Sequence, residues 1–586
     1  MVQYWDSAEC RIISFAELKT RFNADSGRRL NLIDAELQKK TDWTELVDIT
    51  RLEQLMNGES GAIKNSDMEF LILRLQGTDG IRAEVSVDTC CDADCVSLFL
   101  KEKKLTAVFC YRYIKAFVSQ LGVRAKSIVL GEDGRDFFSR TGLKHAITDA
   151  LSESGVDTID LGITPVPAIA AYSYLNNIPG IMLTASHNPA RFNGLKLFIN
   201  GHKLYPTGRM GENSLSFKTV IGEELPGATP GTVIKKNAVE ILEWLIRRSP
   251  VKIRNNSPGQ TIVLDAANGA YSQFATDCFR KLGFNVVNAA CNPGRGMINK
   301  DCSVAPLEEL ERSQDDKSTS ATVRQLIETG RKSTQRRMFA VVFDGDGDRA
   351  FILSYNKEND KVLIHDGDEI GYLIAESLKG NSGSRYKGVF YSTVESDFKL
   401  GEQVSRKLGY NNKVVCVGDR WLSKNYNGES LFIGCERSGH IVFPVKEKGR
   451  KDCLLTGNGL VTALLAIEEI GRLPDDNFLE KSENIRISIR SSKKELFFRG
   501  SSLFKACRLF ISEHNYFIAI EKIFNDDTDM LFFNLEKNNI FVGCLYVRKS
   551  GTEPKISVSL FVERVHIREA NILIEKIGEI IEKNVK

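Results

Sequence analysis

Residues 344–348 read Asp-Gly-Asp-Gly-Asp and directly follow an apolar run, so the sequence predicts three carboxylates on a loop at the end of a buried strand. Carboxylates this close repel one another strongly unless a cation lies among them. The glycines let the backbone fold tightly enough to bring the oxygens together. Hard oxygen ligands favour Mg²⁺ or Ca²⁺, and Mg²⁺ commonly keeps positions open for phosphate oxygens. An EF-hand is disfavoured, because its sixth position would be Arg349 and its twelfth Tyr355.

Ser186 follows a second apolar run, in the stretch Ile-Met-Leu-Thr-Ala-Ser-His-Asn-Pro of residues 181–189. The Asn-Pro pair marks a turn, so we expect Ser186 at the carboxyl end of a strand, where open α/β sheets bind their ligands. A serine beside His187 suggests a hydrolase, but the Gly-x-Ser-x-Gly elbow is absent. An Asn-Gly turn then leads into an expected strand over 195–198, which carries Lys196 on one face.

Three further loops combine residue types that suit a phosphorylated sugar. A glycine-bracketed turn presents Arg82, a side chain suited to an anion. Glu436, Ser438 and His440 occupy every second position, so an extended chain would present them together to sugar hydroxyls. Residues 548–554 combine hydroxyls, cations and a glycine in a turn that can cradle a phosphate. Taken alone, each loop also fits a solvated polar turn.

Together these strings resemble the motifs of the α-D-phosphohexomutases, a family that includes phosphoglucomutases, phosphomannomutases and phosphoglucosamine mutases. The resemblance runs from residue 72 to residue 557, with the motifs in the family's order. Four positions depart from the family's usual residues. Ala83 and Cys435 replace glycines, Lys549 replaces a proline, and Asn458 replaces an aspartate. The matching strings are Gly-Thr-Asp-Gly-Ile-Arg at 77–82, Thr-Ala-Ser-His-Asn-Pro at 184–189, Asp-Gly-Asp-Gly-Asp-Arg at 344–349, Glu-Arg-Ser-Gly-His at 436–440 and Arg-Lys-Ser-Gly-Thr-Glu-Pro at 548–554.

The resemblance implies a phosphomutase, an intramolecular phosphotransferase of the isomerase class. It would interconvert hexose 6-phosphate and hexose 1-phosphate through a phosphoserine enzyme and a bisphosphorylated sugar. The implied cofactors are Mg²⁺ and a hexose bisphosphate as activator and intermediate. The implied catalytic residues are Ser186, Lys196, His187, Arg82 and His440. The implied metal ligands are Ser186, Asp344, Asp346 and Asp348. The sugar would be bound by Glu436, Ser438, Gly418, Asp419, Arg420 and Arg349, and its phosphate by Arg548, Ser550, Gly551 and Thr552.

The substrate and the class of function leave alternatives open. The strings at 77–82 and 417–420 are typical of phosphoglucosamine mutases, but they also occur in phosphomannomutase-like members of the family. We expect glucose or mannose phosphates as substrates, with glucosamine phosphate as the alternative. A second alternative is a haloacid-dehalogenase-type phosphatase, in which Asp344 instead of Ser186 becomes phosphorylated. A third is a non-catalytic relative that binds sugar phosphates. The intact serine, the three aspartates and Lys196 disfavour that last alternative.

Size and composition restrict the class of protein further. At 586 residues the chain exceeds one ordinary core, so several domains are expected. Its net charge of +3 gives no reason to expect a nucleic-acid or membrane partner. No apolar run is long enough to span a membrane, and the start of the sequence is unlike a signal peptide. We expect a cytoplasmic monomer or homodimer whose partner is a small sugar phosphate.

The 13 cysteines are scattered and mostly lie in apolar runs, so we expect reduced thiols in the core. One cluster stands out, with cysteines at positions 90, 91 and 95 and aspartates between them. It lacks a second ligand pair at the spacing of a zinc site, so we assign no metal to it.

Strand-like and helix-like patterns alternate from residue 127 to residue 470, as in βαβ units. The expected fold is α/β, with three consecutive α/β domains of mixed, mostly parallel sheets and a smaller C-terminal α+β domain around a central cleft. Residues 312–337 are polar and show little sign of a buried strand. The expected parts are a helical N-terminal extension of unknown role (1–70), a phosphoserine-loop domain (71–225), a metal-loop domain (226–355), a sugar-recognition domain (356–478) and a phosphate-binding domain (479–586).

Overall fold

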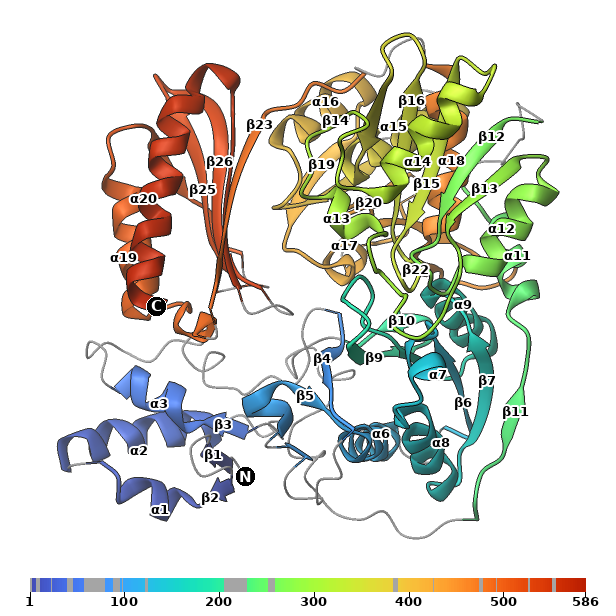
Figure 1. Cartoon of the computed structure of the whole chain (residues 1–586). Helices are drawn as coiled ribbons and strands as arrows, with labels where there is room; N and C mark the ends of the chain where they lie inside the picture. The colour runs from blue at the N-terminus through green and yellow to red at the C-terminus, as the bar shows by residue number, and fades with distance from the viewer. Residues whose placement is uncertain are drawn as a thin grey trace. The chain divides into compact units, whose positions relative to one another are not determined.

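In the computed structural model, the described residues of the chain form five β-sheets with helices packed against them (Figure 1). It divides into two compact units, one made of Met1–Thr78, Tyr205–Glu223 and Lys481–Lys586, the other of Asp79–Leu204 and Glu224–Glu480. The structure describes residues 3–6, 11–22, 24–38, 46–56, 79–87, 95–96, 98–121, 125–204, 229–250, 259–382, 388–424, 426–429, 431–473, 478–491, 493–524, 527, 529–550 and 555–585.

The N-terminal residues form a small α+β fold, in which three strands accompany the expected helices. Strand β1 pairs antiparallel with β2 and parallel with β3. Leu46 and Val47 lie in β3, and the helix begins at Ile49. A strand of three residues is too short to show alternation in the sequence. The elements are β1 (Gln3–Asp6), β2 (Arg11–Ile13), α1 (Phe15–Lys19), α2 (Ala24–Gln38), β3 (Leu46–Asp48) and α3 (Ile49–Met56).

The next sheet carries Ser186 and has the order β11-β7-β6-β8-β9-β4-β5, with β10 paired to β9. Strands β11, β7, β6 and β8 are parallel, and β9 is antiparallel to β8. Strand β8 is buried throughout, as its apolar run predicts for a strand covered on both faces. The strands are β4 (Ile81–Val85), β5 (Lys104–Leu105), β6 (Ser127–Glu132), β7 (Asp157–Ile163), β8 (Gly180–Leu183), β9 (Phe192–Ile199), β10 (His202–Lys203) and β11 (Val233–Lys235). The helices are a π-helical turn (Leu98–Glu102), α6 (Ala107–Leu121), α7 (Arg135–Ser139), α8 (Leu143–Glu153), α9 (Val166–Asn176) and α11 (Val239–Arg247).

The aspartate loop joins two strands of a mixed sheet with the order β13-β12-β15-β16-β17-β14. Strand β17 pairs with β16, so this sheet continues past residue 355. The polar segment 312–337 contains a helix that the sequence analysis missed, with Val323, Leu326 and Ile327 on its buried side. The strands are β12 (Thr261–Asp265), β13 (Asn285–Ala290), β14 (Ser313–Gln314), β15 (Arg337–Phe343), β16 (Ala350–Asn356) and β17 (Lys361–His365). The helices are α12 (Ser272–Lys281), α13 (Val304–Leu307) and α14 (Ala321–Lys332).

A five-stranded sheet with the order β19-β18-β20-β21-β22 follows, and its β20–β21 turn carries Glu436. One continuous hydrophobic core links this sheet and its helices to the two preceding sheets. Residues on these three sheets can therefore hold fixed positions relative to one another. The strands are β18 (Val389–Thr393), β19 (Asn411–Val415), β20 (Phe432–Cys435), β21 (Ile441–Val445) and β22 (Leu454–Gly457). The helices are α15 (Gly367–Ser382), α16 (Phe398–Leu408), α17 (Asp419–Lys424) and α18 (Gly459–Arg472).

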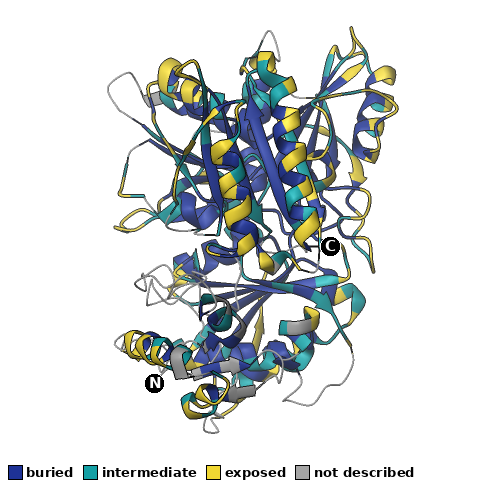
Figure 2. Cartoon of the chain, turned by 90° about the vertical axis from the view of Figure 1, so that its left-hand side faces the viewer, coloured by how far each residue is buried: buried dark blue, intermediate teal, exposed yellow. Residues whose placement is uncertain are grey.

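The C-terminal residues form an antiparallel sheet with the order β23-β27-β26-β25-β24. Helices α19 and α20 pack on one face of it and expose their outer sides (Figure 2). The strands are β23 (Glu483–Arg490), β24 (Ile518–Glu521), β25 (Leu531–Lys537), β26 (Ile540–Lys549) and β27 (Lys555–Val562). The helices are α19 (Ser502–Glu513), α20 (Ile567–Val585) and 3₁₀ turns at Lys494–Leu496 and Arg564–His566.

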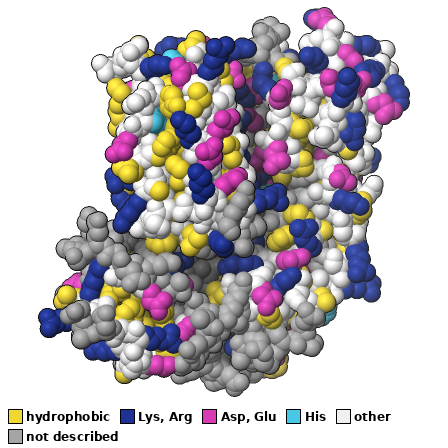
Figure 3. Space-filling view, turned by 60° about the vertical axis from the view of Figure 1, so that its left-hand side comes forward, with side chains coloured by type: hydrophobic (Ala, Val, Ile, Leu, Met, Phe, Trp, Pro, Cys, Tyr) yellow, Lys and Arg dark blue, Asp and Glu magenta, His cyan; other side chains and the backbone are white. Residues whose placement is uncertain are grey.

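Three α/β units and a C-terminal sheet domain form the fold class that we expected, whereas the expected domain boundaries stay a prediction. Ten free cysteines are described, all but Cys453 buried, as predicted for core thiols; Cys90 and Cys91 lie outside the described residues. None of the described helices is long and apolar enough to cross a bilayer. Charges of both signs are interspersed over the face in Figure 3.

Candidate active site

Ser186 lies three residues beyond the end of β8, where the chain leaves the sheet. Its backbone is left-handed, with φ of 50°, a conformation that costs a residue with a Cβ free energy. The backbone N–H of Ser186 donates to Thr184 Oγ1 at 2.8 Å, which stabilises the turn. The side chain is fully buried, and its Oγ donates to Asp344 Oδ2 at 2.6 Å. The loop thus directs one hydroxyl into the aspartate cluster.

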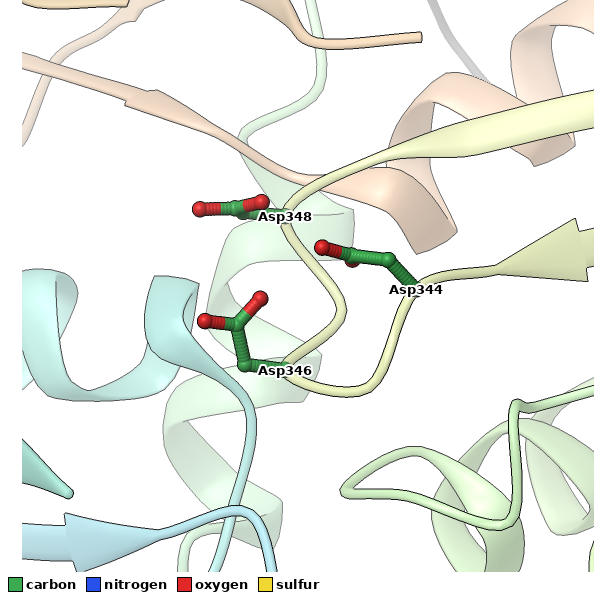
Figure 4. Close-up of side chains that lie close together, drawn as sticks. All are labelled: Asp344, Asp346 and Asp348. Carbon is green, nitrogen blue, oxygen red and sulfur yellow. The ribbon is translucent and has the colours of Figure 1, made fainter. Parts of the chain in front are cut away.

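The three aspartates occupy the turn between β15 and β16, and their carboxylates gather on one side of it (Figure 4). One oxygen from each lies within 4.8 Å of the others, and all three side chains are buried. Gly347 has φ of 75°, and its N–H donates to Asp344 Oδ1 at 3.1 Å. The tight turn therefore brings the carboxylates together as the alternating glycines predict.

The turn has no room for a side chain at Gly347, because an added Cβ would lie 2.4 Å from the Tyr271 ring. We expect Gly347→Ala to cost about 2–4 kcal/mol of folding free energy from the left-handed backbone and overpacking together. Gly142→Ala is the matched control, since Gly142 has φ of 81° with open space around its Cβ position. Thermal unfolding should show a larger fall in Tm for Gly347→Ala. Equal falls would contradict the steric argument.

Two buried lysines bridge the acidic groups. Lys196 Nζ lies 2.8 Å from Asp346 Oδ2, 2.9 Å from Asp348 Oδ2 and 3.0 Å from Asp79 Oδ2. Lys203 Nζ lies 2.7 Å from Asp79 Oδ1 and 3.4 Å from Asp348 Oδ2. Burial opposes the charge on Lys196, but the carboxylates outweigh it and hold the Lys196 pKa well above its usual range. Lys196 therefore stays cationic and balances part of the acidic charge.

The aspartate cluster fits a divalent cation. Asp346 Oδ1 and Asp348 Oδ1 are buried and form no hydrogen bond with the residues that the structure describes. Burial, and then the charges of Asp346 and Asp348, raise the pKa of Asp344 well above its usual range. Buried acceptors without donors are costly, and a cation among them would relieve both this cost and the repulsion. A set made only of oxygen donors suits Mg²⁺ or Ca²⁺.

Two arginines add positive charge around the cluster. Arg82 forms an ion pair with Asp79 and donates to Asn188 Oδ1 at 3.2 Å, on the serine loop. Arg349 Nε lies 4.0 Å from Asp344 Oδ2 and 3.9 Å from Asp348 Oδ1. Such cations can stabilise a phosphoryl group near Ser186.

The two candidate histidines differ in electrostatic environment. For His187, burial and then the nearby Arg349 lower the pKa well below its usual range. His440 Nδ1 lies 3.6 Å from Asp348 Oδ1, and its Nε2 lies 3.3 Å from Asp419 Oδ2. Burial alone would lower the His440 pKa, but the two carboxylates raise it above its usual value. One site therefore contains an imidazole that favours the neutral form and one that favours the charged form.

Apart from Arg349 on the aspartate loop, the expected sugar-binding residues lie at the start of α17 and in the β20–β21 turn. Glu436 Oε1 accepts a hydrogen bond from Gly418 N at 2.7 Å, and Ser438 Oγ donates to Glu436 Oε2 at 3.4 Å. Asp419 lies 2.8 Å from Lys203 Nζ, which links this group to the aspartate cluster. Arg420 Nη1 donates to Leu204 O at 2.7 Å, so at least this nitrogen is used within the protein.

The predicted phosphate loop belongs to the C-terminal sheet. Arg548 lies near the end of β26, and Ser550 N donates to Lys555 O at 2.9 Å. Lys494 Nζ donates to Ser550 O at 2.6 Å, which adds a cation to this turn. Gly551 and Thr552 lie outside the described residues. Asn458, one of the four departures from the family motifs, caps α18 and accepts from the Tyr271 hydroxyl at 3.0 Å.

Several residues at this site were missed by sequence reasoning. Asp79 and Lys203 carry charges into the cluster, and Asp133 accepts from Thr184 Oγ1 at 2.6 Å. Arg135 donates to four carbonyl oxygens of the serine loop, those of Ser186, Asn188, Pro189 and Phe192. The loop Gly-Glu-Asp-Gly-Arg-Asp at 131–136 was visible in the sequence, but nothing in its composition indicated these partners.

Each of the three α/β units matches the model of a known protein family. The models of the phosphoglucomutase/phosphomannomutase α/β/α domains I, II and III match residues 73–208, 245–357 and 366–477. The fold and site thus define a phosphomutase, an isomerase of sugar-phosphate metabolism, with an additional C-terminal sheet domain. The chain belongs to the phosphoglucomutase/phosphomannomutase family.

Individual relatives agree with this assignment. The chain is 30% identical over 406 residues to a phosphoglucosamine mutase of Buchnera aphidicola, covering 68% of this chain and 77% of the relative. It is 28% identical over 518 residues to a phosphoglucosamine mutase of Clostridium botulinum, covering 86% and 100%. A crystal structure of a phosphoglucomutase/phosphomannomutase family protein from Burkholderia thailandensis has the same fold, with a TM-score of 0.60, 18% identity and coverage of 87% and 96%. The family assignment excludes a haloacid-dehalogenase-type phosphatase as the class of this protein.

Proposed function

We propose that the protein interconverts a hexose 6-phosphate and its 1-phosphate, with Ser186 as the phosphoryl carrier. The observation that supports this most directly is the 2.6 Å hydrogen bond from Ser186 Oγ to Asp344 Oδ2. A buried hydroxyl is thereby held beside three carboxylates and the ammonium of Lys196. Phosphoryl transfer depends mainly on alignment and charge neutralisation, and this arrangement provides both.

In the proposed step, the bond between phosphorus and Ser186 Oγ breaks as a bond from phosphorus to a sugar hydroxyl oxygen forms. The hydroxyl proton passes to a base, and Ser186 Oγ takes up a proton as it leaves phosphorus. Of the three candidates for these proton transfers, His187 favours the neutral form that accepts a proton, whereas Lys196 and His440 favour the protonated forms that donate one. Arg82 and Arg349 balance the charge of the phosphoryl oxygens. Asp344, Asp346 and Asp348, with Ser186, would hold Mg²⁺, which when bound neutralises phosphoryl charge. The product is a hexose bisphosphate, which also serves as the activator that phosphorylates Ser186.

The sugar must then turn, so that its other phosphate returns to Ser186. Glu436 and Ser438 would bind the sugar hydroxyls, and Gly418, Asp419 and Arg420 would support that contact. Arg548, Ser550, Gly551 and Thr552 would bind the phosphate that does not react. A loop that recognises phosphate by charge and hydrogen bonds accepts either phosphate of the bisphosphate, which makes both orientations productive.

Three hexose 6-phosphates are candidates for the substrate. The sequence favoured glucose or mannose phosphates, with glucosamine 6-phosphate as the alternative. The relatives from Buchnera and Clostridium, which are called phosphoglucosamine mutases, support glucosamine 6-phosphate as the better substrate. A coupled assay with Mg²⁺ and a trace of hexose bisphosphate should compare kcat/KM for glucose, mannose and glucosamine 6-phosphates. Conversion of none of the three would overturn the proposed function.

Glu436 provides a direct test of sugar recognition. Glu436→Gln keeps the side-chain shape and an oxygen that can accept from Gly418 N, but it removes the charge that strengthens hydrogen bonds from sugar hydroxyls. We expect kcat/KM to fall about 10- to 100-fold, the range for losing charged hydrogen bonds. Glu402→Gln is the control, an exposed residue on α16 paired with Arg406. If Glu436→Gln retained the wild-type kcat/KM, Glu436 would have no role in binding the sugar.

A further inference from the structure

The carbonyl oxygen of Ser186 lies in a small enclosure made by three separate segments. Arg135 Nη2 donates to it at 2.5 Å, and Asn299 Nδ2 donates to it at 2.7 Å. A Cβ added at Gly345 would lie 2.7 Å from this oxygen and 3.0 Å from Asn299 Nδ2, so only glycine leaves room for the contact. Two hydrogen-bond donors and the close backbone of Gly345 therefore fix the position of the Ser186 carbonyl group.

Both sides of Ser186 are held in this way. Thr184 Oγ1 accepts from its N–H, while Arg135 and Asn299 donate to its carbonyl oxygen. The same two side chains also donate to Asn188 O, at 3.0 and 2.9 Å. These bonds compensate for the left-handed backbone of Ser186, which would otherwise relax and move Oγ away from Asp344.

Asn299 reaches the serine loop from the sheet that carries the aspartates. Its segment follows β13, and its N–H donates to Ala267 O at 2.9 Å. Its Oδ1 is buried and forms no hydrogen bond with the described residues, so only the amide nitrogen is used there. The residue therefore acts as a hydrogen-bond donor between the serine loop and the sheet of the metal loop.

We propose that Asn299 is a positioning residue for phosphoryl transfer, which holds the Ser186 peptide so that Oγ faces the aspartate cluster. The inference rests on the proposed role of Ser186 as phosphoryl carrier. Asn299 touches neither the hydroxyl nor the reacting atoms, and it acts through the serine backbone. Its loss should therefore affect the rate of transfer more than the binding of the sugar, because small displacements of reacting groups are costly.

Asn299→Asp tests the donor specifically. Aspartate has the same shape and also tolerates a left-handed backbone, which Asn299 adopts with φ of 56°. It replaces the N–H donor by an acceptor that repels the carbonyl oxygens of Ser186 and Asn188. We expect kcat to fall about 10- to 100-fold while KM stays within about twofold of the wild type. A role in folding alone would lower Tm and leave kcat unchanged.

Asn200→Asp is the matched control, an exposed asparagine with φ of 50° in the turn after β9. It makes the same chemical change in the same backbone conformation and should leave kcat, KM and Tm close to wild type. An Asn299→Asp enzyme with wild-type kcat would overturn the positioning role. A wild-type enzyme without mutase activity would instead overturn the proposed function, so the two failures are distinguishable.

Discussion

Replacing Ser186 with alanine is expected to lower the mutase rate at least about 10⁴-fold and to abolish the covalent phosphoryl adduct. The fall corresponds to about 5.5 kcal/mol of lost transition-state stabilisation. The variant removes only Oγ, the atom that donates to Asp344 Oδ2 at 2.6 Å. The carboxylates, Lys196 and the arginines remain, but no group in that place can accept and return the phosphoryl group.

Two measurements on the same samples test this expectation. Intact mass after incubation with hexose bisphosphate should show one added phosphoryl group on the wild type and none on Ser186→Ala. The coupled assay should show the loss of rate. If the adduct persisted on Ser186→Ala, another residue would be the phosphoryl carrier, and Asp344 would be the first candidate.

Ser173→Ala is the matched control for the serine variant. Ser173 on α9 is also fully buried, and its Oγ donates to Ile178 O at 2.6 Å. The two variants therefore remove the same atom from similarly buried, hydrogen-bonded sites. Ser173 Oγ also accepts from Gly201 N at 2.9 Å, so Ser173→Ala should cost about 1–3 kcal/mol in stability while it retains both the adduct and the rate. Equal losses of rate in the two variants would mean that Ser186→Ala acts through folding.

The parts of the site that could be predicted from sequence share one physical property. Ser186 and Asp344 each follow a short strand that is buried on both faces, and such strands appear in the sequence as unbroken apolar runs. Polar residues that directly follow such a run must lie where the chain leaves the sheet, at the carboxyl end of the strand. This is why the serine and the aspartates could be placed on loops before their mutual distance was known.

The missed residues lack any such signal. Arg135 and Asn299 donate hydrogen bonds to backbone carbonyl oxygens. Because every residue has a backbone carbonyl, the spacing of residues in the sequence cannot identify their partners. Helix α14 was missed for a related reason. Its buried side consists of a few residues within a charged segment, and Gly330, packed against the Tyr355 ring, adds no apolar side chain to the pattern.

Asp346→Asn is expected to abolish the stabilisation of the protein by Mg²⁺. Asp346 Oδ2 is paired with Lys196, but its buried Oδ1 forms no hydrogen bond with the described residues. An ion that binds only the folded state raises Tm with its concentration, because binding adds RT ln(1 + [L]/Kd) to the folding free energy. The neutral amide removes one of three charges that attract the cation, so the rise in Tm should disappear.

Mg²⁺ removal has the same physical basis and tests the site through activity as well. Chelation with EDTA should lower the wild-type rate at least about 10³-fold, and added Mg²⁺ should restore it, because phosphoryl transfer relies on charge neutralisation. Asp360→Asn is the matched control, a partly exposed aspartate in the same α/β unit that pairs with Arg331. It should keep both the rate and the Mg²⁺-dependent rise in Tm. If Asp346→Asn kept that rise as well, the ion would bind elsewhere, and the three carboxylates would have to be balanced by Lys196, Lys203 and the neighbouring arginines.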